Sequence, residues 1–258
     1  HPLALSRRNK TKKSITEDTW QRVERLIRIE WSPEQISGRM KLQGEPYISH
    51  EWIYQHILRD KEHGGELYQH LRCQKKRRKR YGAYERRGNL PDRVWIDERP
   101  AEANQRARIG DWEADTIIGR RHQQAILTLV DRKSRFVLMD KLTTRTAAEA
   151  ARHMLQLLSP WKNHTLTSDN GKDFACHTRV AQFLGIKFFF AHPFSSWQRG
   201  TNENTNGLIR QYFPKKTDFS HLSTDDLSFV IERLNNRPRK CLDFKTPSEV
   251  FLFSNSCT

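Results

Sequence analysis

The sequence predicts a small all-α domain followed by a larger α/β domain with a mixed five-stranded sheet. At 258 residues the chain has room for one large domain or two modest ones. Apolar residues follow helical spacing up to about residue 62, and β-rich runs begin near residue 94. Three antiparallel strands followed by alternating helices and strands are typical of an α/β layer. The expected segments are a basic arm at 1–14, the helical domain at 15–62, a basic linker at 63–93 and the α/β domain at 94–258.

The charge of the chain predicts a polyanionic partner. Lys and Arg number 46 against 30 Asp and Glu, which gives a net charge of +16 and a pI near 10.0. Nucleic acid is favoured over a membrane, because the sequence has no run of 18 apolar residues and no basic amphipathic helix. The four cysteines form no C-x-x-C pair, so a disulfide scaffold or a zinc ribbon is not expected and a reducing cytoplasm suits them.

Three short helices are predicted in the first domain. Apolar residues between 20 and 31 follow helical spacing, and Ser32-Pro33-Glu34-Gln35 is a capping box with proline at the first helical position. Ser49 is the expected N-cap of the third helix. This order is the outline of a helix-turn-helix, and the alternative is a small helical bundle that does not contact DNA.

The third helix would enter the major groove if the motif is a helix-turn-helix. Its expected base-contacting side chains are His50, Glu51, Gln55 and Arg59, and its expected core side chains are Trp52, Ile53, Ile57 and Leu58.

A dense basic run follows in the linker, at Lys75, Lys76, Arg77, Arg78, Lys79 and Arg80. Like charges at this density repel and keep a segment extended unless phosphate neutralises them. The linker is therefore expected to order on DNA, and each phosphate that it engages should add about 0.9 to the log–log salt slope of binding. The alternative is a linker that is only solvated.

The second domain has five predicted strands, at 112–118, 125–130, 136–142, 166–168 and 186–190, with 94–96 as a further short candidate. Helices are expected at 146–158 and 178–184 and from Thr201 to the residue before Pro214. Thr201 is the expected N-cap of this last helix, which places Glu203 in the first turn, where the helix dipole keeps a carboxylate ionised. Arg210 returns to nearly the same face about 10 Å further along the axis.

Three acids lie where a metal site would need them. Asp115 is in the middle of the first long strand, Asp169 ends the fourth, and Glu203 opens the helix after the fifth. Hard oxygen ligands with open coordination positions suit Mg²⁺ or Mn²⁺, and two such ions can activate the attacking oxygen and stabilise the leaving oxygen of a phosphodiester. The pattern alone leaves Asp111, Asp131 and Asp140 as alternatives for the first ligand. Glu113 is expected on the opposite face of the strand from Asp115.

Several stretches resemble transposases of the insertion sequence 30 family. They are Gly110-Asp-Trp-Glu-Ala-Asp-Thr116, Thr128-Leu-Val-Asp-Arg-Lys-Ser-Arg135, Thr167-Ser-Asp-Asn-Gly171, the segment 193–210 and Leu234-Asn-Asn-Arg-Pro-Arg239. The resemblance covers most of the chain. It implies membership of the DDE transposases and retroviral integrases, a ribonuclease H-like catalytic domain, and a catalytic triad of Asp115, Asp169 and Glu203.

The resemblance also implies a mechanism and partners. Water hydrolyses the phosphodiester at the end of the element, and the freed 3′-hydroxyl then attacks target DNA. Asp115 would bridge two Mg²⁺ ions, for which Mn²⁺ can substitute, and Asp169 and Glu203 would each complete one site. Arg210 would hold a nearby phosphate. Arg199, Asn202 and Asn206 are further candidates for DNA contact, whereas Trp197 is expected to pack rather than to stack on a base.

The implied partners are the terminal inverted repeats of the element and target DNA, bound by a homodimer or higher oligomer in the cytoplasm at the nucleoid. Family members usually begin with a further helix-turn-helix that this chain lacks, and its start at His1-Pro2 is that of a fragment or a processed product. The alternative function is therefore an N-terminally truncated, inactive DNA-binding regulator of transposition. A nuclease that acts on RNA–DNA hybrids is disfavoured, since hybrids are read by shape and need no helix-turn-helix.

Overall fold

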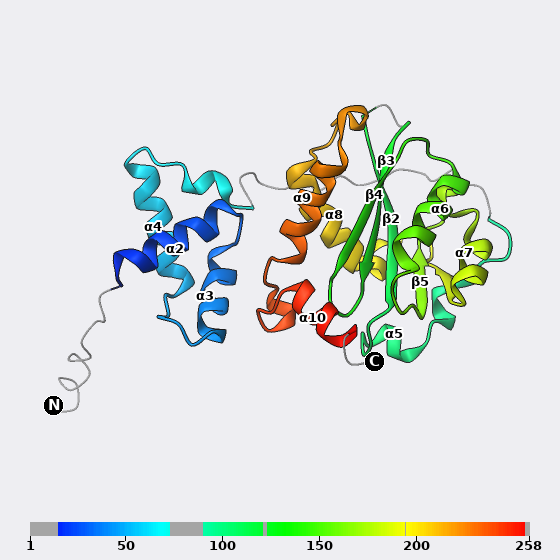
Figure 1. Cartoon of the computed structure of the whole chain (residues 1–258), viewed down its shortest axis with the longest axis horizontal. Coiled ribbons are helices and arrows are strands. Elements are labelled where there is room, and N and C mark those ends of the chain that lie inside the picture. Colours follow the sequence, from blue (N-terminus) through cyan, green and yellow to red (C-terminus); the bar gives the residue numbers. More distant parts are fainter. Residues whose placement is uncertain (1–14, 73–89, 121–122, 194, 256–258) are drawn as a thin grey trace. The chain divides into compact units, whose positions relative to one another are not determined.

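The computed structural model describes residues 15–72, 90–120, 123–193 and 195–255 (Figure 1). The chain divides into two compact units, residues 1–77 and 78–258, and each is described by itself. The predicted basic arm and the basic run from Lys75 to Arg80 lie outside the described residues. Among the described helices, none has the length and apolar character needed to cross a bilayer.

The first unit consists of three capped helices and a short 3₁₀ turn. They are α2 (Glu17–Arg28), α3 (Pro33–Leu42), α4 (His50–Glu62) and η1 (Leu67–His70). The predicted capping box of Ser32 with Gln35 is present, and the Ser49 side chain accepts a hydrogen bond from the Trp52 amide. Residues from every element form the core of this unit: Val23, Ile27, Ile36, Met40, Ile48, Ile53, Ile57 and Leu67.

The core-facing stripe of α4 is narrower than predicted. Ile53 and Ile57 are buried, as expected for positions four residues apart on one helical face. Trp52 is 48% exposed and Leu58 is 50% exposed, so their predicted inward orientation is wrong. The guanidinium of Arg59 lies 5.7 Å from the centroid of the Trp52 ring, a distance at which the aromatic face attracts a cation.

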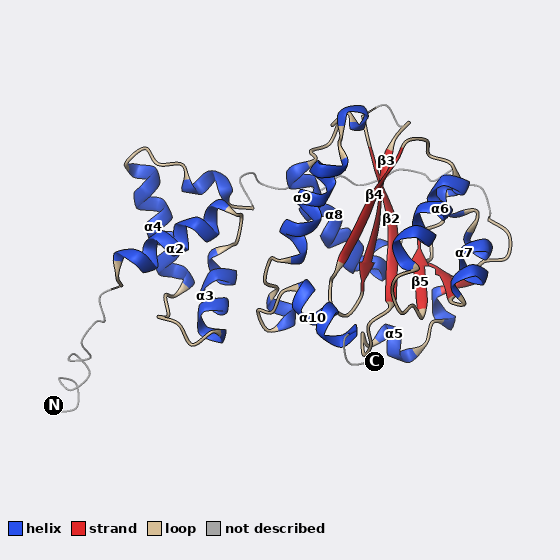
Figure 2. Ribbon diagram, viewed as in Figure 1, coloured by secondary structure: helices blue, strands red, loops and turns tan. Residues whose placement is uncertain are grey.

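The second unit is built on a mixed sheet of six strands in the order β1-β6-β5-β2-β3-β4. Figure 2 draws the strands in red, with helices in blue on either side of them. The strands are β1 (Val94–Trp95), β2 (Asp111–Ile118), β3 (Ala125–Asp131), β4 (Val137–Leu142), β5 (Thr165–Ser168) and β6 (Lys187–Phe190). Strands β2, β3 and β4 are antiparallel, whereas β5 pairs in parallel with both β2 and β6. The predicted α/β class and mixed sheet are confirmed. The sixth strand is the short candidate near residue 94, which pairs in parallel with β6.

Helices cover both faces of this sheet, with α6 and α7 on one face and α8 and α9 on the other (Figure 1). The helices are α5 (Ala101–Asn104), α6 (Ala147–Leu158), α7 (His177–Leu184), α8 (Gly200–Tyr212), α9 (Thr224–Asn235) and α10 (Pro247–Asn255); the 3₁₀ turns are η2 (Ile96–Glu98), η3 (Lys172–Phe174), η4 (Ser196–Arg199), η5 (Phe219–His221) and η6 (Lys240–Leu242). Every residue of β3 is buried, because the sheet is covered on both sides. Leu127 and Leu129 point into the cluster under α6, and Ile126 and Val130 into the cluster under α8.

The start of α6 gives a pH-dependent prediction. Burial raises the pKa of Glu149, but hydrogen bonds from the hydroxyls and backbone amides of Thr143 and Thr144 outweigh it and lower the pKa to about 2. A carboxyl whose pKa falls on folding stabilises the protein above its unfolded pKa and loses that contribution as the pH falls toward 2. Glu149→Gln should therefore lower the free energy of unfolding by about 1 kcal/mol at pH 7 and by less at pH 3.

Urea unfolding at both pH values measures this difference, with Glu232→Gln on the exposed side of α9 as the control. The same loss of stability at pH 7 and pH 3 would show that the charge of Glu149 plays no part.

Candidate active site

Two of the predicted acids meet at the middle of the sheet. Asp115 lies in β2, and Asp169 follows directly after β5, the parallel neighbour of β2. The register pairs Glu113 with Thr167, so Asp115 and Asp169, each two residues further on, lie level with one another on the same face. Strand pairing alone therefore brings the two carboxylates together.

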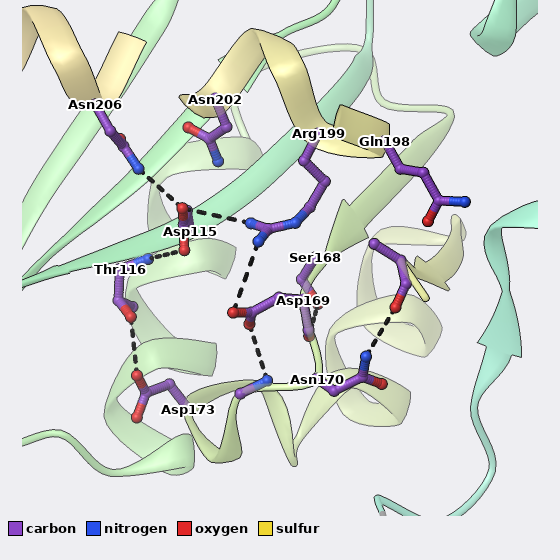
Figure 3. A network of polar contacts seen from close by, with 12 residues as sticks. Asp115, Thr116, Ser168, Asp169, Asn170, Asp173, Gln198, Arg199, Asn202 and Asn206 are labelled. Carbon is purple, nitrogen blue, oxygen red and sulfur yellow. Dashed lines mark hydrogen bonds and ion pairs between the residues drawn. The ribbon is translucent and has the colours of Figure 1, made fainter. Parts of the chain in front are cut away.

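Arg199, the N-cap residue of α8, lies between these two carboxylates (Figure 3). Its Nη1 is 3.4 Å from Asp115 Oδ2, and its Nη2 is 3.7 Å from Asp169 Oδ2. The guanidinium is 13% exposed and both carboxylates are 22% exposed. Arg199 was predicted to contact DNA; in the structure its guanidinium faces the two acids.

Backbone and amide donors fix the orientation of the acid pair. Asp115 Oδ1 accepts from the Thr116 amide at 2.9 Å, and its Oδ2 accepts from Asn206 Nδ2 at 2.8 Å. Asp169 Oδ1 accepts from the Gly171 amide at 2.8 Å. Figure 3 shows that these contacts hold both carboxylates toward Arg199. Each acid therefore has one fixed orientation before any ligand arrives.

Electrostatics at Asp115 favour a bound cation. Burial raises the pKa of the Asp115 carboxyl, the charge of Arg199 acts to lower it, and the neighbouring charge of Asp169 raises it further. Two carboxylates this close repel each other, and Arg199 supplies one positive charge against their two negative charges. The pair therefore attracts further positive charge.

Glu203 stands apart from the acid pair. It lies in the first turn of α8, as predicted, and is exposed. The predicted N-cap is wrong, because α8 begins at Gly200 and the Thr201 side chain is buried, where it accepts a hydrogen bond from Arg135 Nη1 at 2.6 Å. Across the described part of the chain, no three Asp, Glu, His or Cys side chains lie close enough together to hold a metal. In the structure Asp115 and Asp169 therefore lie near each other, and Glu203 does not form a three-residue cluster with them.

The other predicted contacts on α8 have structural partners. Asn202 is fully buried, with its Oδ1 3.2 Å from Thr128 Oγ1, and its predicted DNA contact stays a prediction. Asn206 was also a candidate for DNA contact, but its amide donates to Asp115 instead. Arg210 donates to the carbonyl oxygen of Ile118 at 3.0 Å and to the carbonyls of residues 213 and 214 at 3.3 Å.

Glu113 lies on the same face as Asp115, so its predicted orientation is wrong. Residues two apart in a strand share a face, and the two-residue period of β2 was the signal that could have placed it. Glu113 is fully buried, forms an ion pair with the buried Arg132, and its Oε2 accepts from the Asn202 amide at 2.9 Å. Arg132 Nε in turn donates to the Ala103 carbonyl at 3.0 Å. This buried pair fixes the first turn of α8 against β2.

Two further polar residues near the acids were missed. Thr128 Oγ1 lies within 3.2 Å of the side-chain oxygens of both Asn202 and Asn206. A threonine inside the apolar run of β3 was the available signal. Asp173 accepts a hydrogen bond from Thr116 Oγ1 at 2.9 Å (Figure 3). It also forms an ion pair with Arg145 at 3.1 Å. Both residues support the backbone around Asp115.

Trp197 is exposed rather than packed. Its side chain in η4 is 73% exposed, so the predicted packing is wrong. The exposed indole lies two residues before Arg199 in the chain.

Comparison with known proteins gives close relatives in sequence. The chain is 46% identical over 243 residues to the transposase for insertion sequence element IS4351 of Bacteroides fragilis, covering 93% of this chain and 74% of the relative. It is 40% identical to the transposase for insertion sequence element IS1086 of Cupriavidus metallidurans, covering 90% and 71%. It is also 40% identical to the transposase for insertion sequence element IS30A of Escherichia coli K12, covering 87% and 62%.

The catalytic core domain of BIV integrase is a similar solved structure, with a TM-score of 0.46 and 23% identity over 57% of this chain and 95% of that chain. No protein-family model matches the chain. The sequence identities to the transposases are high and extend over most of each protein. The chain therefore belongs to the insertion sequence 30 family of transposases.

Proposed function

We propose that this chain is a DDE transposase that cleaves phosphodiesters at the ends of its element and transfers the freed 3′-hydroxyl into target DNA. The observation that carries the proposal is the acid pair, in which Asp115 of β2 and Asp169, directly after the neighbouring strand β5, both face the guanidinium of Arg199. Their oxygens are the hard ligands that Mg²⁺ and Mn²⁺ prefer, so the donor chemistry fits the divalent ions of this class.

Asp115 and Asp169 would hold the divalent ions, with Glu203 as the third carboxylate. Bound there, such ions activate an attacking oxygen and stabilise a leaving oxygen. The protein's own contribution is orientation: Asn206 and the Thr116 amide fix Asp115, and the Gly171 amide fixes Asp169. Arg199 places a positive charge where a phosphodiester would carry negative charge.

The exposed Trp197 can stack on a splayed base, since a base and an indole face attract whatever the sequence. Arg210 stays a proposed phosphate contact at its partly exposed position near the end of β2. We also propose that the basic run from Lys75 to Arg80 binds the DNA backbone. A homodimer or higher oligomer on DNA follows from the need to join two ends, because each end needs an active site.

The proposed reaction is tested by nicking of a supercoiled plasmid that carries the ends of the element. We expect nicking with Mg²⁺ or Mn²⁺, no nicking with EDTA, and loss of nicking in Glu203→Gln, whose side chain keeps its size but cannot ionise. Intact DNA binding by the variant is the control. DNA binding without nicking by the wild-type chain would favour the alternative, a truncated regulator of transposition.

Helix α4 is the proposed reader of DNA sequence in the first unit. Gln55 and Arg59 are exposed on it, as a recognition helix requires. Replacing both with Ala should weaken binding to the terminal repeats by about 1–3 kcal/mol for each lost base contact. Binding to random DNA should change less, as measured by fluorescence anisotropy. Unchanged affinity for both DNAs would remove α4 from the interface.

A further inference from the structure

A cavity of about 230 Å³ lies on the side of α8 that does not carry Arg199. It is lined by Arg106, Arg135, Thr201, Asn204, Arg239 and Cys241, among others. Arg106 follows α5, Arg135 follows the turn after β3, and Arg239, the last residue of the stretch Leu234–Arg239, lies between α9 and η6. Three segments far apart in sequence thus each contribute one guanidinium to one cavity.

The cavity is strongly cationic. Its lining, which falls wholly within the described residues, contains three arginines and no acidic side chain. Burial lowers the pKa of Arg106, and the positive charges of Arg135 and Arg132 lower it further. Arg135 donates to Thr201 at 2.6 Å and Arg239 donates to the Leu234 carbonyl at 3.0 Å, so hydrogen bonds to neutral oxygens help to hold these two side chains in place. An anion between them would relieve the mutual repulsion.

Backbone conformation also points to these side chains. Arg106 has φ +57° and Arg135 has φ +65°. This left-handed region costs a residue with a Cβ roughly 1–2 kcal/mol, and Gly or Asn adopts it more readily. The backbone conformation therefore does not explain why Arg occupies these two positions, and the cationic side chains themselves are the more direct reason.

Helix α8 separates this cavity from the acid pair. Residues 200, 201, 204 and 205 line the cavity, whereas Asn206, together with the N-cap residue Arg199, faces Asp115. An α-helix with its side chains is about 10–12 Å across, so the two sites are roughly one helix width apart. Glu203 lies in the same first turn of α8. A nucleic-acid strand that crosses the first turn of α8 would pass both sites.

We propose that this arginine cavity binds a backbone phosphate of the same DNA strand whose reacting phosphodiester lies at Asp115 and Asp169, further along that strand than the adjacent phosphate. Guanidinium groups match phosphate oxygens with paired donors, and three of them around one cavity can engage a single phosphate from several directions. The proposal rests on the proposed DNA substrate. In this proposal Arg239 helps to hold the DNA strand at a fixed distance beyond the phosphodiester that reacts.

Cys241 provides a probe inside the cavity, because its free thiol is exposed there. The rate of iodoacetamide alkylation at Cys241 is measured by mass spectrometry in the full chain, with Cys176 in the same sample as the reference. We expect a short DNA duplex, added with EDTA, to slow alkylation at Cys241 several-fold and to leave Cys176 unchanged. Inorganic phosphate at high concentration should protect in the same way. Arg106→Gln should abolish both effects.

The salt dependence of DNA binding is the second measurement. Arg106→Gln should lower the log–log salt slope by about 0.9, the value for one phosphate contact. Arg179→Gln, on the exposed face of α7, removes the same charge and should leave the slope unchanged. Equal slopes for the two variants would overturn the proposal, as would protection of Cys241 by inorganic phosphate but not by DNA. Because EDTA is present, a failure here is separate from a failure of nicking.

Discussion

Asp115→Asn is expected to lower metal-dependent DNA nicking by a factor on the order of 10²–10³ or more, the scale for losing one group that stabilises charge in a transition state. The carboxylate is already oriented by Asn206 and the Thr116 amide, so the amide replacement keeps the shape of the site and removes its charge. Asp169→Asn should give a loss of similar size, because Asp169 lies level with Asp115 across the strand pair. Plasmid nicking at saturating Mg²⁺ measures both variants.

Asp225→Asn is the matched control, since Asp225 is exposed in the first turn of α9 and far along the chain from the acid pair. It should nick at the wild-type rate. DNA affinity should be retained by all three variants, or rise for Asp115→Asn and Asp169→Asn, because a negative charge is removed near a bound phosphate. Wild-type nicking by Asp115→Asn would place the reaction at another site.

Glu113→Gln is expected to lower the free energy of unfolding by about 3–5 kcal/mol, the cost of leaving a buried charge without its partner. Glu113 is fully buried and Arg132 is 4% exposed, so water cannot replace the lost carboxylate. For a domain of this size the melting temperature should fall by roughly 2–4 °C for each kcal/mol. Urea unfolding followed by tryptophan fluorescence gives the change.

The double variant Glu113→Gln/Arg132→Met separates charge from packing. Removing both charges should restore part of the lost stability, so the two substitutions should be strongly non-additive. Glu102→Gln, at an exposed position in α5, should change stability by less than about 0.5 kcal/mol. Additive losses would mean that the two residues act independently, despite their contact.

The strand positions of Asp115 and Asp169 could be predicted because strand patterns are local, although the pattern alone left Asp111, Asp131 and Asp140 as alternatives for the first metal ligand. Asp115 and Asp169 could each be assigned to the middle or the end of a strand, and parallel neighbours carry such residues to one place. The alternation of side chains along a strand was misapplied to Glu113, which was predicted on the face opposite Asp115 although residues two apart share a face. The α/β order and the helix starts at Ser32 and Ser49 followed in the same way from patterns of a few residues.

The sequence could not predict which side chains from distant segments contact one another in the folded protein. Asn202 was assigned to DNA because asparagine is polar, but its burial depends on Thr128, which lies 74 positions earlier in the chain. Arg199 was read as a DNA contact for the same reason, and only the tertiary structure shows that its nearest charges are acids. For Trp52 and Trp197 the error was the opposite one: both were predicted to be packed because they are aromatic, and both are exposed.

The charged face of β2 also affects how the sheet can assemble. Trp112 and Ala114 point into the apolar cluster under α6, and Glu113 and Asp115 point toward α8. A slip of β2 by one residue would reverse these faces and bury two carboxylates among the apolar side chains of the cluster under α6. Burying a carboxylate without a positively charged partner costs a large free energy. The acids proposed for catalysis thereby disfavour the mispaired sheet. A chain that has folded with β2 in this register has, for that reason, already brought the two acids of the pair together.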